Sequence, residues 1–212
     1  ADEFADYVGS LMDTRKNQAG EDLISQLAAV EDGGDRLSAQ ELIATCVLLL
    51  NAGHEASVNG LGNGIVAALH HPDQMDMLRA DPEGVSPTAL EEFLRFDSPL
   101  HLFERTATED TVIGGVTVNA GQKIAALLGS ANRDETVFDE PDRMMLRRDP
   151  NPHLGFGAGI HFCIGAPLAR MEMSVALPAL ISRFPDIQLS RPPTSRGTFV
   201  LRGWAEVPVK RA

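Results

Sequence analysis

Apolar side chains near the start of the chain recur at the three- and four-residue spacing of amphipathic helices. Phe4, Val8 and Leu11 predict a first short helix, which ends before the break around Gly20. The spacing resumes over residues 23–27 and predicts a second short helix that ends at a Gly-Gly turn at residues 33–34. We therefore expect two short helices to open the chain.

A much longer helix is predicted next. Ser38 is followed three residues later by Glu41, the side-chain pair of a capping box at a helix start. Helix-compatible sequence then continues without a proline to His71 and stops at Pro72. A continuous helix over this stretch is about 50 Å long at the α-helical rise of 1.5 Å per residue.

The second half of the chain mixes helices with short strands. Further helices are predicted over Gln74 to Arg79, from Pro87 to Phe96 and from Ile164 to Phe184. Short alternating stretches, such as residues 116–118 and 124–126, predict small sheets, and edge strands are expected in the C-terminal tail. Residues 138–159 are rich in proline and glycine without clear periodicity, which predicts a long irregular connection. The expected fold class is one mainly α domain over residues 1–212 with small β-sheets.

Composition and charge exclude several classes of protein. The 212 residues carry 18 Lys and Arg against 30 Asp and Glu, so the net charge of −12 argues against nucleic acid or an anionic membrane as the main partner. Two cysteines are too few for a disulfide framework, and the longest apolar run is too short to span a bilayer. A cytoplasmic protein is expected. Because the sequence begins Ala1-Asp2-Glu3 without an initiator methionine, we also expect it to be a piece of a longer chain.

The strongest local signal is the segment from Phe156 to Gly165. Its three glycines let the backbone approach another group closely, and Cys163 comes just before a predicted helix, where the helix dipole favours a thiolate. A buried cysteine in a tight turn is the ordinary interpretation of such a residue. Zinc is disfavoured because Cys46 is the only other thiol, whereas haem needs a single protein ligand. A metal-free thiol enzyme would require His161 as the base, and its two-residue offset does not by itself aim it at the sulfur.

Two weaker signals accompany the cysteine. The long predicted helix is apolar on both sides of a polar interruption at residues 51–57, where Glu55 is costly unless it is paired, faces a wet cavity or lies on a solvated face. Glu92 and Arg95 are three residues apart on a predicted helix and can pair, although such pairs are common.

Together, and in this order, the three signals resemble the C-terminal half of the cytochrome P-450 family of haem-thiolate monooxygenases, in particular its bacterial soluble branch. The family pattern Phe-x-x-Gly-x-x-x-Cys-x-Gly is matched from Phe156 to Gly165. The resemblance implies that Cys163 is the axial ligand of haem b, within a loop that includes Phe156 and Gly157. It further implies that Arg105 and His161 bind the haem propionates.

The resemblance also assigns a structural triad and an oxygen-binding groove. Glu92 and Arg95 match the Glu-x-x-Arg pair of the family, and Arg143 matches the segment that supplies the second arginine of the triad. Ala52, Gly53 and Glu55 match the groove pattern Ala-Gly-x-Glu-Thr.

The groove departs from the family at its threonine. Ala56 stands at that position, and the hydroxyl appears one residue later, on Ser57. Successive side chains on an α-helix point about 100° apart around the helix axis, so Ser57 points in a different direction from residue 56. We therefore list Glu55, Ala56 and Ser57 as the catalytic positions. One hypothesis is that a substrate hydroxyl and ordered water complete the proton relay with Glu55 as its source. The other is that oxygen activation is poor.

The implied function is insertion of one oxygen atom of O2 into a small hydrophobic substrate, with electrons from a ferredoxin-type donor. The alternative is a truncated or degenerate haem-binding module without turnover. The resemblance covers the whole chain but half of the family's fold, so the N-terminal half is an implied partner. Arg147, Arg148 and Arg170 are candidates for a basic patch toward the donor, and His54 and His101 are candidates for the substrate pocket or for structural roles.

Overall fold

The structure is a computed structural model that describes residues 2–17, 20–29, 31–32 and 35–212. The chain forms two compact units that divide between Glu55 and Ala56. Each unit has its own hydrophobic core, and each is described by itself.

The first unit contains the two predicted short helices. Helix α1 runs over Asp2–Asn17 and α2 over Leu23–Ala29, and the two-residue strands β1 (Glu31–Asp32) and β2 (Asp35–Arg36) pair in antiparallel fashion. A small core joins both helices to the start of α3; it consists of Val8, Met12 and Leu42, with Phe4, Ile24, Leu27, Ile43 and Cys46 packed partly buried against it. The predicted Gly33-Gly34 turn lies outside the described residues.

Helix α3 (Ala39–His70) confirms the long predicted helix. The capping box at its start is formed: the Glu41 backbone N–H donates to the Ser38 hydroxyl at 3.3 Å, and the Ser38 N–H donates to the Glu41 carboxylate at 2.8 Å. The polar interruption at residues 51–57 does not break the helix. These residues are more polar than those on either side, but they are helical throughout.

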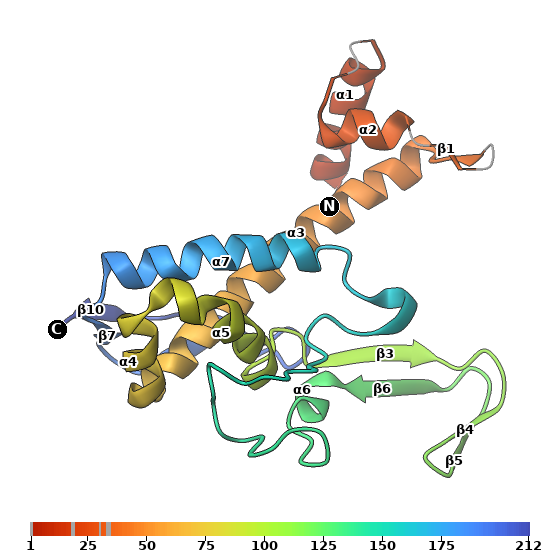
Figure 1. Cartoon of the computed structure of the whole chain (residues 1–212). Helices are drawn as coiled ribbons and strands as arrows, with labels where there is room; N and C mark the ends of the chain where they lie inside the picture. Colours follow the sequence, from red (N-terminus) through yellow and green to blue (C-terminus); the bar gives the residue numbers. More distant parts are fainter. Residues whose placement is uncertain (1, 18–19, 30, 33–34) are drawn as a thin grey trace. The chain divides into compact units, whose positions relative to one another are not determined.

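The second unit is built around α4 (Pro72–Ala80), α5 (Pro82–Phe96) and α7 (Ala166–Arg183), which lie near one another in Figure 1. Helix α5 starts earlier than predicted, because Asp81 caps it by accepting from the Gly84 N–H at 3.0 Å and Pro82 occupies the first helical position. The fully buried core of this unit includes Leu78, Val85, Ala89, Phe93, Leu146, Leu177 and Ile181.

Helices α3 and α5 approach so closely that one contact tolerates no side chain. A Cβ atom on Gly64 would overlap the ring of Phe93, which is fully buried. The observed packing of α5 against α3 therefore requires glycine at position 64.

The strands form small antiparallel pairs, as the sequence predicts. In this unit the described pairs are β3 (Leu102–Thr106) with β6 (Lys123–Leu127), β4 (Thr111–Ile113) with β5 (Val116–Val118), β7 (Ile187–Leu189) with β10 (Val209–Arg211), and β8 (Thr194–Ser195) with β9 (Trp204–Glu206). Figure 1 shows β3 and β6 as a two-stranded ribbon that continues into the β4–β5 hairpin.

A long irregular segment follows α6 (Leu128–Ala131) and leads to α7. Between these helices the chain forms turns and bends and one short 3-10 turn, η1 (Gly159–His161). This confirms the irregular connection predicted over residues 138–159. Within the described ranges, no helix combines the length and apolar character needed to cross a bilayer.

Candidate functional site

The cysteine loop, residues 156–165, is held by its own backbone. The Cys163 N–H donates to the Phe156 carbonyl at 2.9 Å, and the Gly157 N–H donates to the Leu154 carbonyl at 2.9 Å. Gly157 and Gly159 have φ values of 72° and 67°, in the left-handed region that favours glycine. The loop is a closed turn that presents Cys163 two residues before Gly165, the N-cap of α7. The helix thus starts slightly later than the sequence predicts.

Cys163 and its apolar neighbours face solvent in this chain. The cysteine is exposed, and Ile160, Phe162 and Ile164 have exposed fractions of 97%, 51% and 90%. Large apolar side chains are normally withdrawn from water, so a group of them around an exposed thiol marks a surface suited to an apolar partner.

Strand β3 meets the cysteine loop and brings Arg105 toward it. A Cβ atom on Gly157 would lie 3.8 Å from the Phe103 ring, and the Arg105 guanidinium lies 5.5 Å from the centre of that ring. Arg105 and His161 are both exposed. Two side chains able to donate hydrogen bonds to a carboxylate are therefore associated with the same loop.

His161 has no hydrogen bond to the Cys163 sulfur among the described contacts. A metal-free thiol enzyme would need such a base beside the sulfur. The geometry therefore gives no support to that interpretation.

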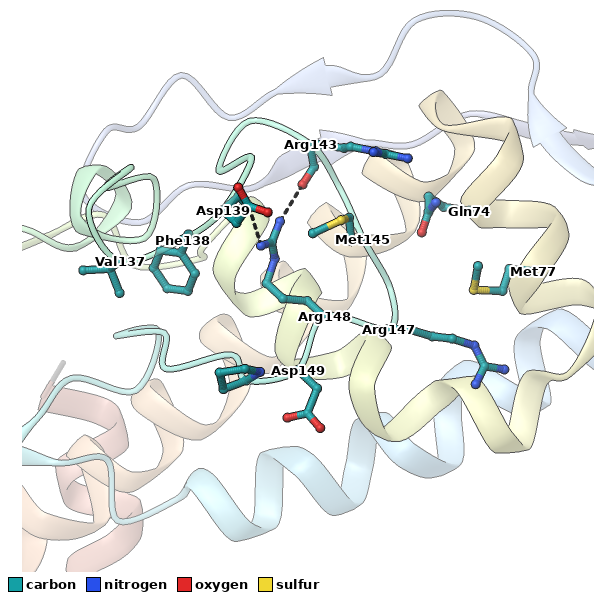
Figure 2. Close-up of a pocket in the computed structure, with 11 residues that line it drawn as sticks. Gln74, Met77, Val137, Phe138, Asp139, Arg143, Met145, Arg147, Arg148 and Asp149 are labelled. Carbon is teal, nitrogen blue, oxygen red and sulfur yellow. Dashed lines mark hydrogen bonds between the residues drawn. The ribbon is translucent and has the colours of Figure 1, made fainter.

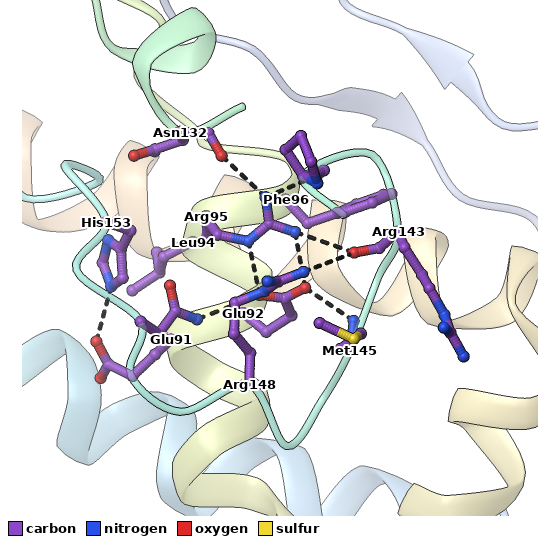
Figure 3. Close-up of polar contacts among 12 residues, drawn as sticks. Glu91, Glu92, Leu94, Arg95, Phe96, Asn132, Arg143, Met145, Arg148 and His153 are labelled. Carbon is purple, nitrogen blue, oxygen red and sulfur yellow. Dashed lines mark hydrogen bonds and ion pairs between the residues drawn. The ribbon is translucent and has the colours of Figure 1, made fainter. Parts of the chain in front are cut away.

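A buried charge cluster is centred on Glu92 and Arg95 of α5 (Figure 3). Glu92 and Arg95 are both fully buried and joined by two hydrogen bonds of 2.8 Å. The Nε of Arg148 donates to the same carboxylate at 3.2 Å, and the Met145 N–H donates to it at 2.8 Å. A buried carboxylate is tolerated because two guanidiniums and a backbone donor replace its water.

The prediction that Arg143 is the third member of this triad is wrong. Its side chain is 57% exposed and pairs with Glu140 at 3.0 Å, whereas its backbone carbonyl accepts from Arg95 and Arg148. Arg148 takes the place instead. Burial alternates along this segment: Met144, Leu146 and Arg148 point inward. The Arg148 N–H donates to the Met145 carbonyl at 2.9 Å, so residues 145–148 form a turn, and no helical or strand spacing in the sequence identifies the buried arginine.

An open pocket of about 520 Å³ lies beside this cluster (Figure 2). The lining includes Met77, Phe138 and Met145 and the charged side chains Asp139, Arg143, Arg147, Arg148 and Asp149. The Arg148 guanidinium is committed to the backbone oxygens of Asp139 and Arg143, at 2.7 and 3.1 Å. Because carboxylates and cations both line the pocket, its charge favours neither an anionic nor a cationic ligand.

Glu91, next to Glu92, belongs to a second cluster. Arg170 of α7 donates to its carboxylate twice, at 2.6 and 2.9 Å, and the Nε2 of His153 lies 2.7 Å from it. Partial burial opposes ionisation of Glu91, but the hydrogen bonds from Arg170 and His153 outweigh it and lower the pKa of this carboxyl to about 2. Glu91 is therefore ionised at neutral pH.

These contacts reduce the basic patch expected from the sequence. Arg148 is buried, and Arg170 is committed to Glu91. Arg147 remains 60% exposed, with Asp81 at 3.8 Å. The expected grouping of three solvent-facing arginines is therefore incorrect.

The predicted groove residues all lie on α3, at the boundary of the two units. Ala52, Gly53 and Glu55 are exposed at the end of the first unit, and Ala56 and Ser57 are partly buried at the start of the second. His54 is also exposed.

His101 is half-buried within the second unit. Its ring packs edge-on against Phe199, and its backbone N–H donates to the Val200 carbonyl. Burial, with the nearby Arg202 charge, lowers the pKa of His101 below its usual value. These contacts favour the structural role over the pocket role for His101.

Comparisons with known proteins agree on one family. The family profile described as cytochrome P-450 matches residues 3–202. The chain is 46% identical over 210 residues to nocardicin C N-oxygenase of Nocardia uniformis subsp. tsuyamanensis, covering 96% of this chain and 52% of that protein. It is 42% identical over 214 residues to 6-deoxyerythronolide B hydroxylase of Saccharopolyspora erythraea, covering 99% of this chain and 53% of that protein.

Solved structures give the same result. The structure of PksS, the cytochrome P-450 of the bacillaene polyketide synthase of Bacillus subtilis 168, superposes with a TM-score of 0.94 at 42% identity, covering 99% of this chain and 55% of that chain. The chain thus spans about half the length of the curated relatives it matches.

Proposed function

Because the chain belongs to the cytochrome P-450 family, whose members bind haem b, we propose that it is the C-terminal, cysteine-bearing half of a haem-thiolate monooxygenase domain. The observation that carries the proposal is the presentation of Cys163. Cys163 is exposed together with the apolar residues beside it in sequence, in a loop closed by its own backbone next to the start of α7.

The residues of the loop fit haem. A porphyrin is a flat apolar ring with two carboxylates, so it requires a soft axial donor, apolar contacts and cationic or hydrogen-bonding groups at one edge. Cys163 supplies the donor, Ile160, Phe162 and Ile164 supply apolar surface, and Arg105 and His161 are assigned to the propionates. Phe156 and Gly157 shape the loop, since the Phe156 carbonyl and the left-handed Gly157 close the turn that orients Cys163.

When bound, haem supplies the activation of O2, so that with two electrons and two protons one oxygen atom enters the substrate and the other leaves as water. The chain's own part is to move protons. We assign Ala52 and Gly53 to the groove on α3, and Glu55 to the proton source, because its exposed carboxylate can exchange protons with water. Ala56 has no hydroxyl, so a substrate hydroxyl and ordered water complete the relay.

The relay assignment has its own test. Ala56→Thr introduces a hydroxyl at the partly buried position. With a substrate that bears a suitably placed hydroxyl, the ratio of product formed to electrons consumed is expected to stay the same or fall. If the substitution raised that ratio for every substrate tried, the substrate-assisted relay would be rejected.

The proposed electron donor is a ferredoxin-type protein, and the proposed substrate is a small hydrophobic molecule. The proposed location is the cytoplasm. Bacterial relatives with oxygenase and hydroxylase names support the reaction class.

The second candidate is a haem-binding module without turnover. It is favoured by Ala56 at the threonine position. The two candidates predict different products. Electrons delivered to a module without turnover yield peroxide and no oxygenated product, whereas a monooxygenase yields oxygenated product.

The first experiment is a haem-binding spectrum. Haemin is added to the purified chain, the complex is reduced and carbon monoxide is introduced. Thiolate ligation predicts a strongly red-shifted Soret band of the ferrous carbonyl complex, which is lost in Cys163→Ala. Cys46→Ala is the matched control, because Cys46 packs partly buried against the core of the other unit. An unshifted band, or a shifted band that persists in Cys163→Ala, would reject Cys163 as the ligand.

A further inference from the structure

The Glu91 cluster is separate from the buried Glu92 network, although the two carboxylates are neighbours in sequence. Successive residues on a helix point about 100° apart, so α5 directs Glu92 toward Arg95 and Arg148, and Glu91 toward the other side. Figure 3 shows the contact of Glu91 with His153 apart from the Glu92 contacts. The reaction proposed above gives this second cluster no role.

Each basic member of the cluster also contacts Phe156, the first residue of the cysteine loop. The Arg170 guanidinium lies 4.6 Å from the centre of the Phe156 ring, and the His153 ring lies 6.1 Å from it. The Nδ1 of His153 accepts the Gly155 N–H at 3.0 Å. The Phe156 carbonyl in turn accepts the Cys163 N–H. A continuous set of contacts therefore runs from Glu91 through Phe156 to the backbone of the cysteine.

The same contacts place a positive charge beside Phe156, the first residue of the cysteine loop. Arg170 is on α7, seven residues after Cys163, and its position is fixed by the two hydrogen bonds to Glu91. Hydrogen bonding to Glu91 raises the pKa of Arg170 above its usual value, and the Cys163 charge contributes in the same direction. The Glu91 carboxylate, ionised because its own pKa is lowered, offsets part of the Arg170 charge.

We propose that Glu91, His153 and Arg170 form a positioning cluster that holds a fixed positive charge and the Phe156 ring beside Cys163, and that Glu91 sets how much of that charge the sulfur experiences. The consequence for a bound haem rests on the function proposed above. The electrostatic effect at the sulfur does not, since it follows from residues of this chain.

The test measures the local electrostatic potential at Cys163 without haem. Alkylation by anionic iodoacetate is compared with alkylation by neutral iodoacetamide, and modification of the Cys163 peptide is followed by mass spectrometry, which separates it from Cys46. The ratio of the two rates reports the charge that the reagent meets, because the fraction of ionised thiol cancels. The variants are Glu91→Gln, Arg170→Met and the double variant.

Opposite shifts are expected. Glu91→Gln leaves Arg170 uncompensated and should raise the iodoacetate-to-iodoacetamide ratio by about twofold. Arg170→Met leaves Glu91 uncompensated and should lower the ratio by about the same factor. The double variant should return close to the original ratio, and all differences should shrink in ~1 M salt, where the screening length is about 3 Å.

A purely structural role predicts a different pattern. Both single variants weaken the same ion pair, so they would move the ratio in one direction, and the double variant would not restore it. That pattern, or no change in any variant, overturns the proposal. Arg170→Lys keeps the charge and should keep the ratio; a fall as large as in Arg170→Met would also overturn it. Arg191→Met with Glu206→Gln removes an exposed ion pair elsewhere in the unit and is the matched control.

A second readout applies to the haem-loaded chain. The reduction potential should rise in Glu91→Gln and fall in Arg170→Met, since reduction adds negative charge at the iron. If the alkylation ratios behave as expected while haem is not bound, the proposed function fails and the positioning cluster stands. If haem binds through Cys163 while the ratios do not move, the cluster fails and the proposed function stands.

Discussion

The buried carboxylate Glu92 determines how the irregular segment is attached to the helices. Its side chain accepts from Arg95, Arg148 and the Met145 backbone, so residues from two distant parts of the chain share one anion. A buried ion pair of this kind costs desolvation and contributes mainly by fixing which groups meet. Removing one of its arginines should be far more costly than removing an exposed arginine nearby.

Arg148→Met is expected to lower the free energy of unfolding by roughly 3 kcal/mol, because it leaves the buried Glu92 charge and several backbone acceptors short of a donor. Arg143→Met, at an arginine 57% exposed, should change it by less than about 0.5 kcal/mol. Urea denaturation followed by circular dichroism measures both. Equal effects of the two substitutions would contradict the reassignment of the triad.

Because of the Glu91 cluster, the free energy of unfolding should depend on pH in the acidic range. The folded-state pKa of Glu91, about 2, is below its reference value of 4.5, so its contribution is fully present above about pH 4.5 and is lost as the pH falls toward 2. The difference in unfolding free energy between the original chain and Glu91→Gln should therefore shrink over this window. Denaturation at a series of pH values tests it, and a pH-independent difference would rule out the lowered pKa.

At the scale of elements, helix packing in the second unit depends on one glycine. Gly64 on α3 faces the buried ring of Phe93 on α5 with no room for a Cβ atom, whereas a Cβ on Gly62 would meet nothing within 4 Å. The two positions lie on the same helix and differ in whether a neighbour occupies the space.

Gly64→Ala should destabilise the chain by about 1–3 kcal/mol, because the Phe93 ring or the helix must shift. Gly62→Ala should stabilise it by up to about 1 kcal/mol through helix propensity. Thermal and urea denaturation of the two variants measure these changes in stability. Stabilisation by both substitutions would show that the close approach of α3 and α5 is absent in solution.

The cysteine loop depends on backbone conformation in a different way. Gly159 has a φ of 67° and no neighbour within 4 Å of an added Cβ atom, so the cost of Gly159→Ala is conformational, about 1–2 kcal/mol. We expect weakened haem binding with little change in the helical signal. Haem titration and circular dichroism on the same sample test this, and unaltered haem affinity would contradict it.

At the scale of the molecule, helix α7 exposes several large apolar side chains. On α7, Leu168, Met171 and Val175 are 51%, 58% and 68% exposed and share one face at helical spacing. Met173, two residues from Met171, is 2% exposed in the core. The relatives that the chain matches are about twice as long, so they have further residues available to cover such a face.

Met171→Gln should reduce self-association at high concentration and change the free energy of unfolding by less than about 0.5 kcal/mol. Met173→Gln should cost about 2–5 kcal/mol, because it puts an amide into the core and removes apolar contacts. Sedimentation velocity and urea denaturation measure the two effects. Strong destabilisation by Met171→Gln would mean that this face is covered within the chain itself.

The sequence by itself determined the features that depend on local chemistry. The capping box of Ser38 and Glu41 set the start of α3, and the absence of proline up to Pro72 set its length. The spacing of Phe156, the loop glycines and Cys163 identified the family, because this pattern is local and specific. Glu92 and Arg95 were also identified correctly, since a pair three residues apart on one helix needs no tertiary information.

Only the tertiary structure decided which distant side chains meet. Arg148 instead of Arg143 reaches Glu92 because the chain turns over residues 145–148, where the Arg148 N–H donates to the Met145 carbonyl, and this turn directs Arg148 inward. The spacing of charges does not reveal such a turn. Arg170 appears as a surface charge in the sequence, and its commitment to Glu91 arises because two helices far apart in the chain bring it there. Local patterns are fixed by neighbouring residues, whereas the pairing of buried charges depends on how separate elements pack, because their desolvation is offset by partners elsewhere in the fold.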